Sequence, residues 1–216
     1  RLEDPARLTG RGNFTDDIHL AGTLEAAFVR SPHAHAKINS IDVTRAASHP
    51  GVQRIFTAAD LPGNLRHMRV PFQVPNPAIS QPFQQRLLEE DEPWFVGEPI
   101  ALIVADSRYI AEDAAELIEI DYNPPAAATD TLRTTLNGAA QLHDDAPNNI
   151  CFDWGKGDQA ATEAAFAKAA HVTTLELINN RVVVNPMEPR AAICDYDTAS
   201  DRLTLYTSSQ GSHVIR

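Results

Sequence analysis

A run of seven apolar residues, Pro99 to Ala105, limits the folds open to this chain more than any other segment. Such a run is best explained as a strand that is covered on both faces. It is too short to cross a membrane, which takes about 20 apolar residues. We therefore expect a buried strand here, inside a domain that also contains helices.

The segments around this run alternate between strand-like and helix-like patterns, which is typical of mixed α/β structure. We expect strands at residues 24–30, 36–43, 52–57 and 118–122, a short helix at 44–48, a turn at 58–61 capped by Thr57, and a helix after residue 107. Asp106 or Ser107 supplies the cap of that last helix. Six prolines between residues 62 and 93 exclude a continuous helix or central strand there, because each proline removes a hydrogen-bond donor.

Residues 126 to 150 lose periodicity and collect Thr, Asn and Asp, so they mark the expected domain boundary. After them we expect a helix at 159–170 capped by Asp158 and a strand at 172–177. Strands at 190–196 and 202–207 are expected to form a hairpin.

Charge and cysteine content exclude several classes of protein. The 216 residues include 18 basic and 29 acidic side chains, for a net charge of −11, and no stretch gathers the basic ones, so we expect no nucleic-acid partner. Cys151 and Cys194 lie too far apart for a CxxC pair or a cysteine-based zinc site, which indicates thiols in a reducing cytosol. The first residues contain no hydrophobic segment, so we expect neither a secretion signal nor a membrane anchor.

Two motifs have the spacing of binding sites. His33-Ala34-His35 would place two imidazoles on one face of an extended segment, which suits zinc or copper, but catalytic zinc takes three protein ligands and no third lies nearby. We expect a structural role and no metal. Gly155-Lys156-Gly157-Asp158 precedes a helix, where anions bind, yet it matches neither the dinucleotide fingerprint nor the P-loop. Asp158 is therefore expected to act as the helix cap.

Nucleophiles and acids also form no recognisable catalytic site. Ser208, Ser209 and Ser212 flank no G-x-S-x-G elbow. The acidic runs at 89–92 and 144–145 are predicted to be solvated surface, because catalytic carboxylates need shielded and unequal environments. Residue patterns alone thus name no catalytic group.

A series of short motifs, taken together and in order, is more specific than any one of them. They are Arg7–Gly12, Asp16-Asp17, Ala27–Ala36, Pro50–Val52, Ala59–Leu61, Phe95–Ala101, Ala111–Glu116, Asp121-Tyr122, Pro186–Arg190 and Thr207–Gln210. In this order the chain resembles the molybdopterin-binding large subunit of the molybdenum hydroxylases, the xanthine dehydrogenase and aldehyde oxidase family. It is most similar to the branch with the carbon monoxide dehydrogenase large subunits.

The resemblance implies an α/β (α+β) fold in three parts: a hammerhead domain at 1–125, a linker at 126–144, and the N-terminal portion of a molybdopterin-binding domain at 145–216. It also implies that the glycine-rich Phe-Gly-Gly-Lys segment and the glutamate base lie beyond Arg216, so we expect the chain to be an N-terminal fragment of the catalytic subunit. The residues after Gln210 read Gly-Ser-His where the family often has Pro before His, so substrate contacts are not carried over.

The same resemblance implies the site and the chemistry. Gln210 stands where the family's glutamine donates a hydrogen bond to an oxo ligand of molybdenum, a task that suits a neutral amide. It implies no catalytic residue and no metal ligand within this chain. The intact enzyme would oxidise an aldehyde, an N-heterocycle or carbon monoxide with water as oxygen source.

Partners follow from the same resemblance. Iron-sulfur clusters and FAD would be carried by partner subunits or domains, since two isolated cysteines cannot hold a cluster. The implied assembly is a cytoplasmic hetero-oligomer with the remainder of the large subunit, and the isolated chain would be inactive and cofactor-free. The alternative is a non-catalytic α/β interaction or assembly module with the hammerhead fold, distinguished by whether the gene continues beyond codon 216.

Overall fold

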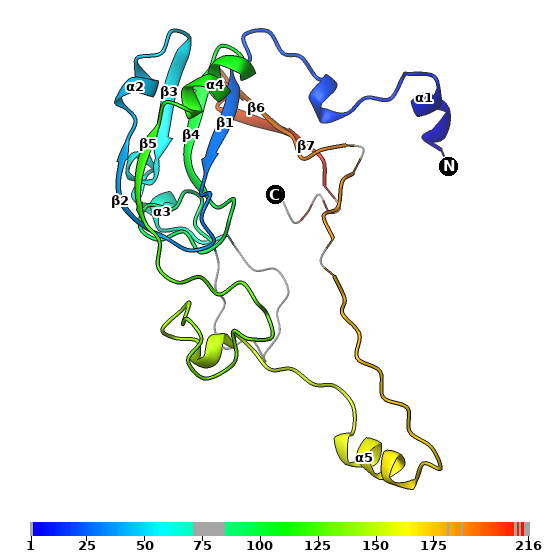
Figure 1. The fold of residues 1–216 in the computed structure, drawn as a ribbon. Coiled ribbons are helices and arrows are strands. Elements are labelled where there is room, and N and C mark those ends of the chain that lie inside the picture. Colours follow the sequence, from blue (N-terminus) through cyan, green and yellow to red (C-terminus); the bar gives the residue numbers. More distant parts are fainter. Residues whose placement is uncertain are drawn as a thin grey trace. The chain divides into compact units, whose positions relative to one another are not determined.

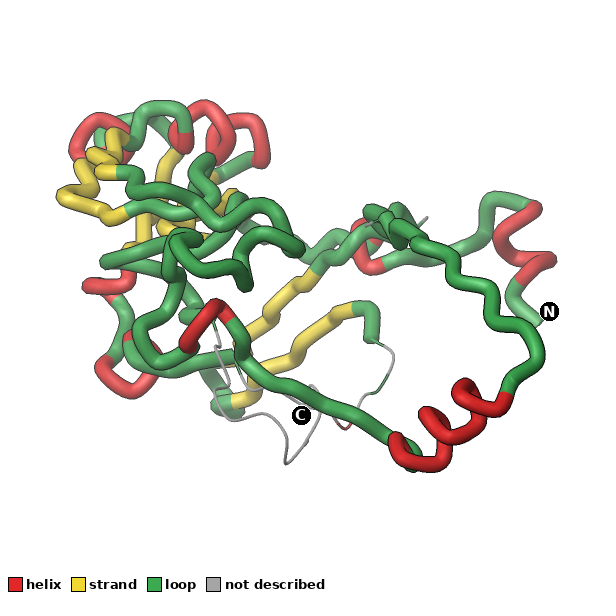
Figure 2. Tube along the Cα trace, turned by 60° about the horizontal axis from the view of Figure 1, so that its bottom comes forward, coloured by secondary structure: helices red, strands yellow, loops and turns green. Residues whose placement is uncertain are grey.

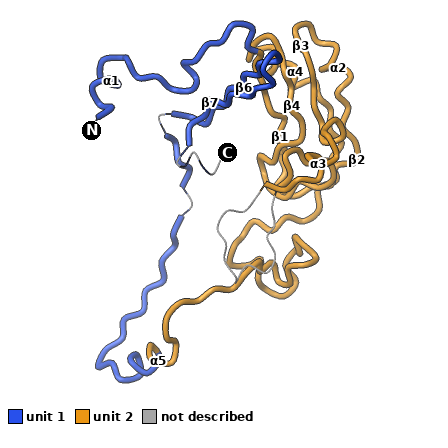
Figure 3. The backbone as a smooth tube through the Cα atoms, turned by 180° about the vertical axis from the view of Figure 1, so that it is seen from behind, with its two compact units in different colours: residues 1–23, 163–216 blue, residues 24–162 orange. Residues whose placement is uncertain are grey.

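The computed structural model describes residues 2–70, 85–180, 182–186, 188–209, 211 and 213. The chain forms two compact units, which Figure 3 colours separately: residues 24–162, and residues 1–23 together with 163–216. The terminal arm at 1–23 therefore belongs to the same unit as the C-terminal part of the chain.

The unit at 24–162 is built on a three-stranded antiparallel sheet in the order β1 (Glu25–Arg30), β4 (Pro99–Ala105) and β3 (Val52–Thr57) (Figure 1). The apolar run is thus the middle strand, as predicted. Ile100, Ala101, Ile103 and Ala105 are fully buried. Because neighbouring residues of a strand face opposite sides of a sheet, burial of both Ile100 and Ala101 confirms that both faces of β4 are covered.

Helix α4 (Arg108–Ala115) packs against this sheet. Its fully buried residues Ala111 and Ala114 join Ile103 of β4 in one core cluster, together with α2 (Thr44–Ala47). The Ser107 hydroxyl accepts a hydrogen bond from the Ile110 N–H at 3.3 Å and so begins the helix, which settles the predicted choice of cap.

A second, two-stranded antiparallel sheet pairs β2 (Lys37–Asp42) with β5 (Glu119–Asn123). The short helices η2 (Ala58–Asp60) and α3 (Gly63–Arg66) follow β3. Thr57 and Asp60 cap η2 reciprocally, which confirms the predicted turn.

The segment at 126–158 is mostly loop, with one short helix, η3 (Pro147–Asn149) (Figure 2). The Asn149 side chain organises it. Its amide donates to the carbonyl oxygens of Thr134 at 2.8 Å and Ala140 at 2.9 Å, and its Oδ1 accepts from the Leu142 N–H at 2.7 Å. These three side-chain bonds supplement the local backbone hydrogen bonds of the segment.

The second unit contains α1 (Asp4–Leu8), η1 (Thr15–Asp17), most of α5 (Gln159–Lys168) and a hairpin of β6 (Ala192–Asp197) with β7 (Arg202–Thr207). The predicted hairpin is confirmed, with Ala192 opposite Thr207 at its open end. The Asp158 carboxylate accepts from the Ala161 N–H at 2.9 Å, so the predicted cap of α5 is also confirmed.

The predicted strand at 172–177 is wrong. These residues form no strand, and the side chains of Leu175 and Leu177 are 75% and 78% exposed. A strand forms only when a neighbour pairs with its backbone, and the described part of the chain offers this segment no such neighbour. Among the described residues, helices long and apolar enough to span a bilayer are also absent.

Candidate functional site

Gln210, the predicted cofactor contact, lies outside the described residues, but residues 207–209, which lead to it, are described. The Thr207 hydroxyl, at the end of β7, donates to the Ala191 carbonyl oxygen at 3.0 Å. The Gly211 N–H donates to the Ser209 hydroxyl at 2.9 Å. The turn therefore leaves the hairpin at its open end, where the last ladder pair joins Ala192 to Thr207.

The residue types at 207–213 indicate the kind of group that this segment can bind. Residues 207–213 read Thr-Ser-Ser-Gln-Gly-Ser-His, without a carboxylate, lysine or arginine. Hydroxyl, amide and backbone N–H donors can hold an anionic, oxygen-rich group without adding a charge of their own. This donor set fits the molybdopterin cofactor that the resemblance implies.

The histidines of the His33-Ala34-His35 motif are engaged in packing. His35 is only 7% exposed, and its Nε2 lies 2.9 Å from Oε1 of Glu92. Its ring stacks on Trp94 with the centroids 4.7 Å apart, whereas the edge of the His33 ring meets Tyr122 at 4.8 Å. No group of three or more His, Cys, Asp or Glu side chains able to hold a metal occurs among the described residues.

Trp94 contacts a second histidine, since His143 from the loop segment lies against it with ring centroids 4.3 Å apart. Burial lowers the pKa of His143, and His35 and Arg69 act in the same direction. The carboxylates of Glu92 and Asp145 oppose this shift. The stack fastens the loop segment to the sheet-bearing part of the same unit.

The prediction of a solvated acidic run at 89–92 is wrong for Glu89, which is 2% exposed. Its Oε1 accepts hydrogen bonds from the N–H groups of Glu90 at 3.0 Å and Asp91 at 3.1 Å, and lies 3.3 Å from Nη1 of Arg86. These donors compensate the loss of hydration that burial of a carboxylate entails. Asp144 and Asp145, in contrast, are exposed as predicted.

Glu98 is a second buried carboxylate of this region, at 1% exposure. Its Oε2 accepts from the Trp94 N–H at 2.6 Å, and burial raises its pKa. The carboxylates of Glu89 and Glu98 thus both accept hydrogen bonds from nearby backbone N–H groups, and Glu89 also contacts Arg86. We infer that they shape this loop rather than carry out chemistry.

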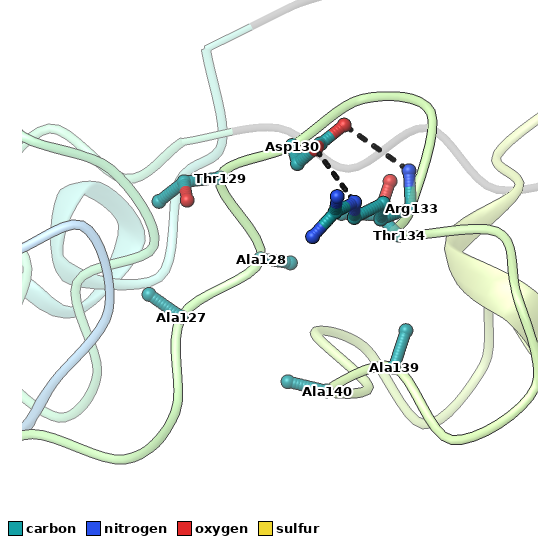
Figure 4. Close-up of a pocket in the computed structure, with 8 residues that line it drawn as sticks. All are labelled: Ala127, Ala128, Thr129, Asp130, Arg133, Thr134, Ala139 and Ala140. Atoms are coloured by element: carbon teal, nitrogen blue, oxygen red, sulfur yellow. Dashed lines mark hydrogen bonds and ion pairs between the residues drawn. The ribbon is translucent and has the colours of Figure 1, made fainter.

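A hollow of about 210 Å³ lies in the loop segment (Figure 4). It is lined by Ala127, Ala128, Thr129, Asp130, Arg133, Thr134, Ala139 and Ala140. Its two charged side chains pair with each other, with Arg133 Nε 3.4 Å from Asp130 Oδ2. Four alanines and an internally neutralised pair give this hollow no converging reactive groups.

Comparison with protein families agrees with the fold. Residues 9–125 match the aldehyde oxidase and xanthine dehydrogenase a/b hammerhead domain, and residues 142–216 match the molybdopterin cofactor-binding domain. The chain belongs to the aldehyde oxidase and xanthine dehydrogenase family, whose members are molybdenum oxidoreductases.

Among its relatives, the chain aligns with large subunits. It is 36% identical over its whole length to the carbon monoxide dehydrogenase large chain of Afipia carboxidovorans, and 35% identical over its whole length to the nicotine 6-hydroxylase large subunit of Paenarthrobacter nicotinovorans. It spans 27% and 26% of the length of these two relatives.

Solved structures show the same likeness. Reconstituted carbon monoxide dehydrogenase from Oligotropha carboxidovorans superimposes with a TM-score of 0.84 at 34% identity, covering 100% of this chain and 27% of that one. Quinoline 2-oxidoreductase from Pseudomonas putida 86 gives 0.79 at 35% identity, covering 97% and 26%.

Proposed function

We propose that this chain is the N-terminal part of the catalytic large subunit of a molybdenum hydroxylase. The enzyme would oxidise an aldehyde, an N-heterocycle or carbon monoxide, with water as oxygen source. The observation that carries the proposal is the neutral-donor sequence at 207–213, which follows the open end of the β6–β7 hairpin inside the stretch matched by the molybdopterin cofactor-binding domain.

In this proposal the bound cofactor supplies the two-electron oxidation, and the chain's own residues hold and orient it. The side-chain amide of Gln210 donates a neutral hydrogen bond to the cofactor. One such bond contributes on the order of 1 kcal/mol, which is too little to retain a cofactor by itself. We therefore place the remaining contacts and the glutamate base after Arg216, and we propose that the 216-residue chain alone is inactive.

We further propose that electrons leave through iron-sulfur and FAD groups on partner subunits. A multi-subunit assembly, though not the identity of its redox groups, is supported by a relative that is 33% identical, the subunit gamma of the 6-hydroxypseudooxynicotine dehydrogenase complex of Paenarthrobacter nicotinovorans. Cys151 and Cys194 both remain thiols, and two cysteines are too few for a cluster. Thiols also agree with the cytoplasm as the proposed location.

The test is to express the full-length subunit with its partner subunits and to measure molybdenum content and turnover. Carbon monoxide, benzaldehyde, nicotine and quinoline serve as substrates, with a redox dye as acceptor. We expect near-stoichiometric molybdenum and turnover of at least one of the four. A gene that stops at codon 216, or a full-length subunit without molybdenum, would instead support the non-catalytic module.

Gln210→Ala in that subunit tests the cofactor contact. Loss of a hydrogen bond of about 1 kcal/mol should lower kcat about fivefold, since about 1.4 kcal/mol corresponds to tenfold. Gln53→Ala is the matched control, because Gln53 bonds Asp106 at the sheet and should leave kcat unchanged. Equal kcat values for Gln210→Ala and wild type would contradict the assignment of Gln210.

A further inference from the structure

The N-terminal arm meets the C-terminal part of its unit at a single buried residue. Thr15 is 7% exposed, and it is the one buried residue among the described residues of the arm at 2–23. It opens η1, which contacts β6 of the hairpin. Burial at this point shows where the arm is held.

Glu188 holds it. Its Oε1 accepts hydrogen bonds from the Thr15 N–H at 3.2 Å and from the Thr15 hydroxyl at 3.4 Å, across 173 residues of sequence. The first N–H groups of a helix have no partner within the helix, so a carboxylate is a favourable acceptor there. Because a single oxygen accepts both bonds, the position of Glu188 relative to η1 is defined by two donors.

Glu188 is also connected to the open end of the hairpin. Pro189 follows it and fixes its own φ angle, which stiffens the link to Ala191. The Ala191 carbonyl oxygen accepts from the Thr207 hydroxyl at 3.0 Å, directly before the Ser208-Ser209 turn. A short series of contacts therefore runs from η1 through Glu188 and Ala191 to the residue that begins the turn.

We propose that Glu188 is a positioning residue: by binding Thr15 it fixes the open end of the β6–β7 hairpin, and so the backbone at 207–209 that leads toward Gln210. The expected effect of Glu188 on catalysis rests on the proposed function, whereas its effect on the order of residues 207–209 does not. It gives a physical role to two motifs from opposite ends of the chain, the one near Asp16-Asp17 and the one at Pro186–Arg190. Both motifs belong to the family pattern, but no local sequence pattern indicates that they touch.

The structural part is tested on the 216-residue chain by ¹⁵N relaxation and amide chemical shifts. In Glu188→Ala we expect residues 15–17 and 207–209 both to change shift and to become more mobile. Glu188→Gln should restore both sets, because an amide oxygen can still accept the two bonds. Asp195→Ala removes an exposed carboxylate from the middle of β6 and should change neither set beyond its own neighbours.

The catalytic part is tested in the full-length subunit with the substrate found to turn over. We expect Glu188→Ala to lower kcat several-fold at unchanged KM and molybdenum content, with rescue by Glu188→Gln. Adding Glu188→Ala to Gln210→Ala should cause no further loss, because both act through one contact.

Three outcomes would overturn the positioning role: unchanged relaxation at 207–209 in Glu188→Ala, additive losses in the double variant, or an unchanged kcat in Glu188→Ala while Gln210→Ala is impaired. A normal kcat in Gln210→Ala would instead overturn the proposed role of Gln210. The relaxation data would then still decide whether Glu188 orders the turn.

Discussion

Gly51 lies where the loop after α2 enters β3, and no other residue fits its conformation without cost. Its φ is +85°, in the region that favours glycine. A Cβ built there would lie 2.7 Å from Cδ1 of Ile110, which packs against the core cluster, and 3.4 Å from Oδ2 of Asp106. Gly51→Ala therefore combines backbone strain with overpacking of α4 against the sheet.

The expected loss can be separated into these two parts. The left-handed conformation costs a residue with a Cβ roughly 1–2 kcal/mol. Pushing Ile110 away from a packed site costs about 1–3 kcal/mol more. Since domains are stable by only about 5–15 kcal/mol, a total loss of about 2–5 kcal/mol would be readily measured.

Two other glycines of the same unit allow the backbone strain to be measured separately from the overpacking. Gly97 has φ +94° with nothing within 4 Å of a built Cβ, so Gly97→Ala should show the strain alone. Gly63 begins α3, has no left-handed φ and also has open space, so Gly63→Ala should be nearly neutral. The measurement is the free energy of unfolding from urea titrations followed by circular dichroism.

Ile110→Val provides the decisive comparison, because it removes only Cδ1, the atom in conflict with the new Cβ. Alone it should cost about 0.5–1.5 kcal/mol. Combined with Gly51→Ala it should relieve the overpacking, so that the pair costs less than the sum of its parts. If Gly51→Ala is no less stable than Gly97→Ala, or if the double variant is additive, the reasoning from the 2.7 Å contact is refuted.

Three further predictions concern the same chain. Burial lowers the pKa of His143, so His143 binds a proton more readily when the loop segment is undocked than when it is docked. The contact of His143 with Trp94 should therefore be complete above the ordinary pKa of about 6.5 and be lost as the pH falls through the lowered pKa. The loss should appear as a change in tryptophan fluorescence, and His143→Gln should abolish that pH dependence. Ser107→Ala should lower the free energy of unfolding by about 1 kcal/mol in urea titrations, and Ser107→Thr should retain most of it, because a hydroxyl still caps α4. Residues 182–184 are three valines that are 80–84% exposed, so the chain should bind a hydrophobic dye, and changing all three to serine should reduce that binding; equal binding by both would show that the dye site lies elsewhere.

Local features of this protein could be predicted from the sequence because their causes lie within a few residues. The apolar run at 99–105 predicts a strand that is buried on both faces, and it is the middle strand of the sheet. The caps at Ser107 and Asp158 and the hairpin at 192–207 likewise depend on side chains next to the backbone that they serve. The family could also be predicted from the sequence, because the short motifs and their order can be recognised without knowing which residues are in contact.

Tertiary structure alone decided which distant groups meet. Glu89 became buried because Arg86 and the backbone donors of the next residues compensate its charge, which the composition of an acidic run does not show. Residues 172–177 carry the pattern of a strand but remain unpaired among the described residues, because a strand depends on a partner elsewhere in the chain. The contact of Thr15 with Glu188 joins residues 173 apart, and no local pattern encodes such a pair: its stability comes from the satisfaction of buried donors, which only the folded chain brings together.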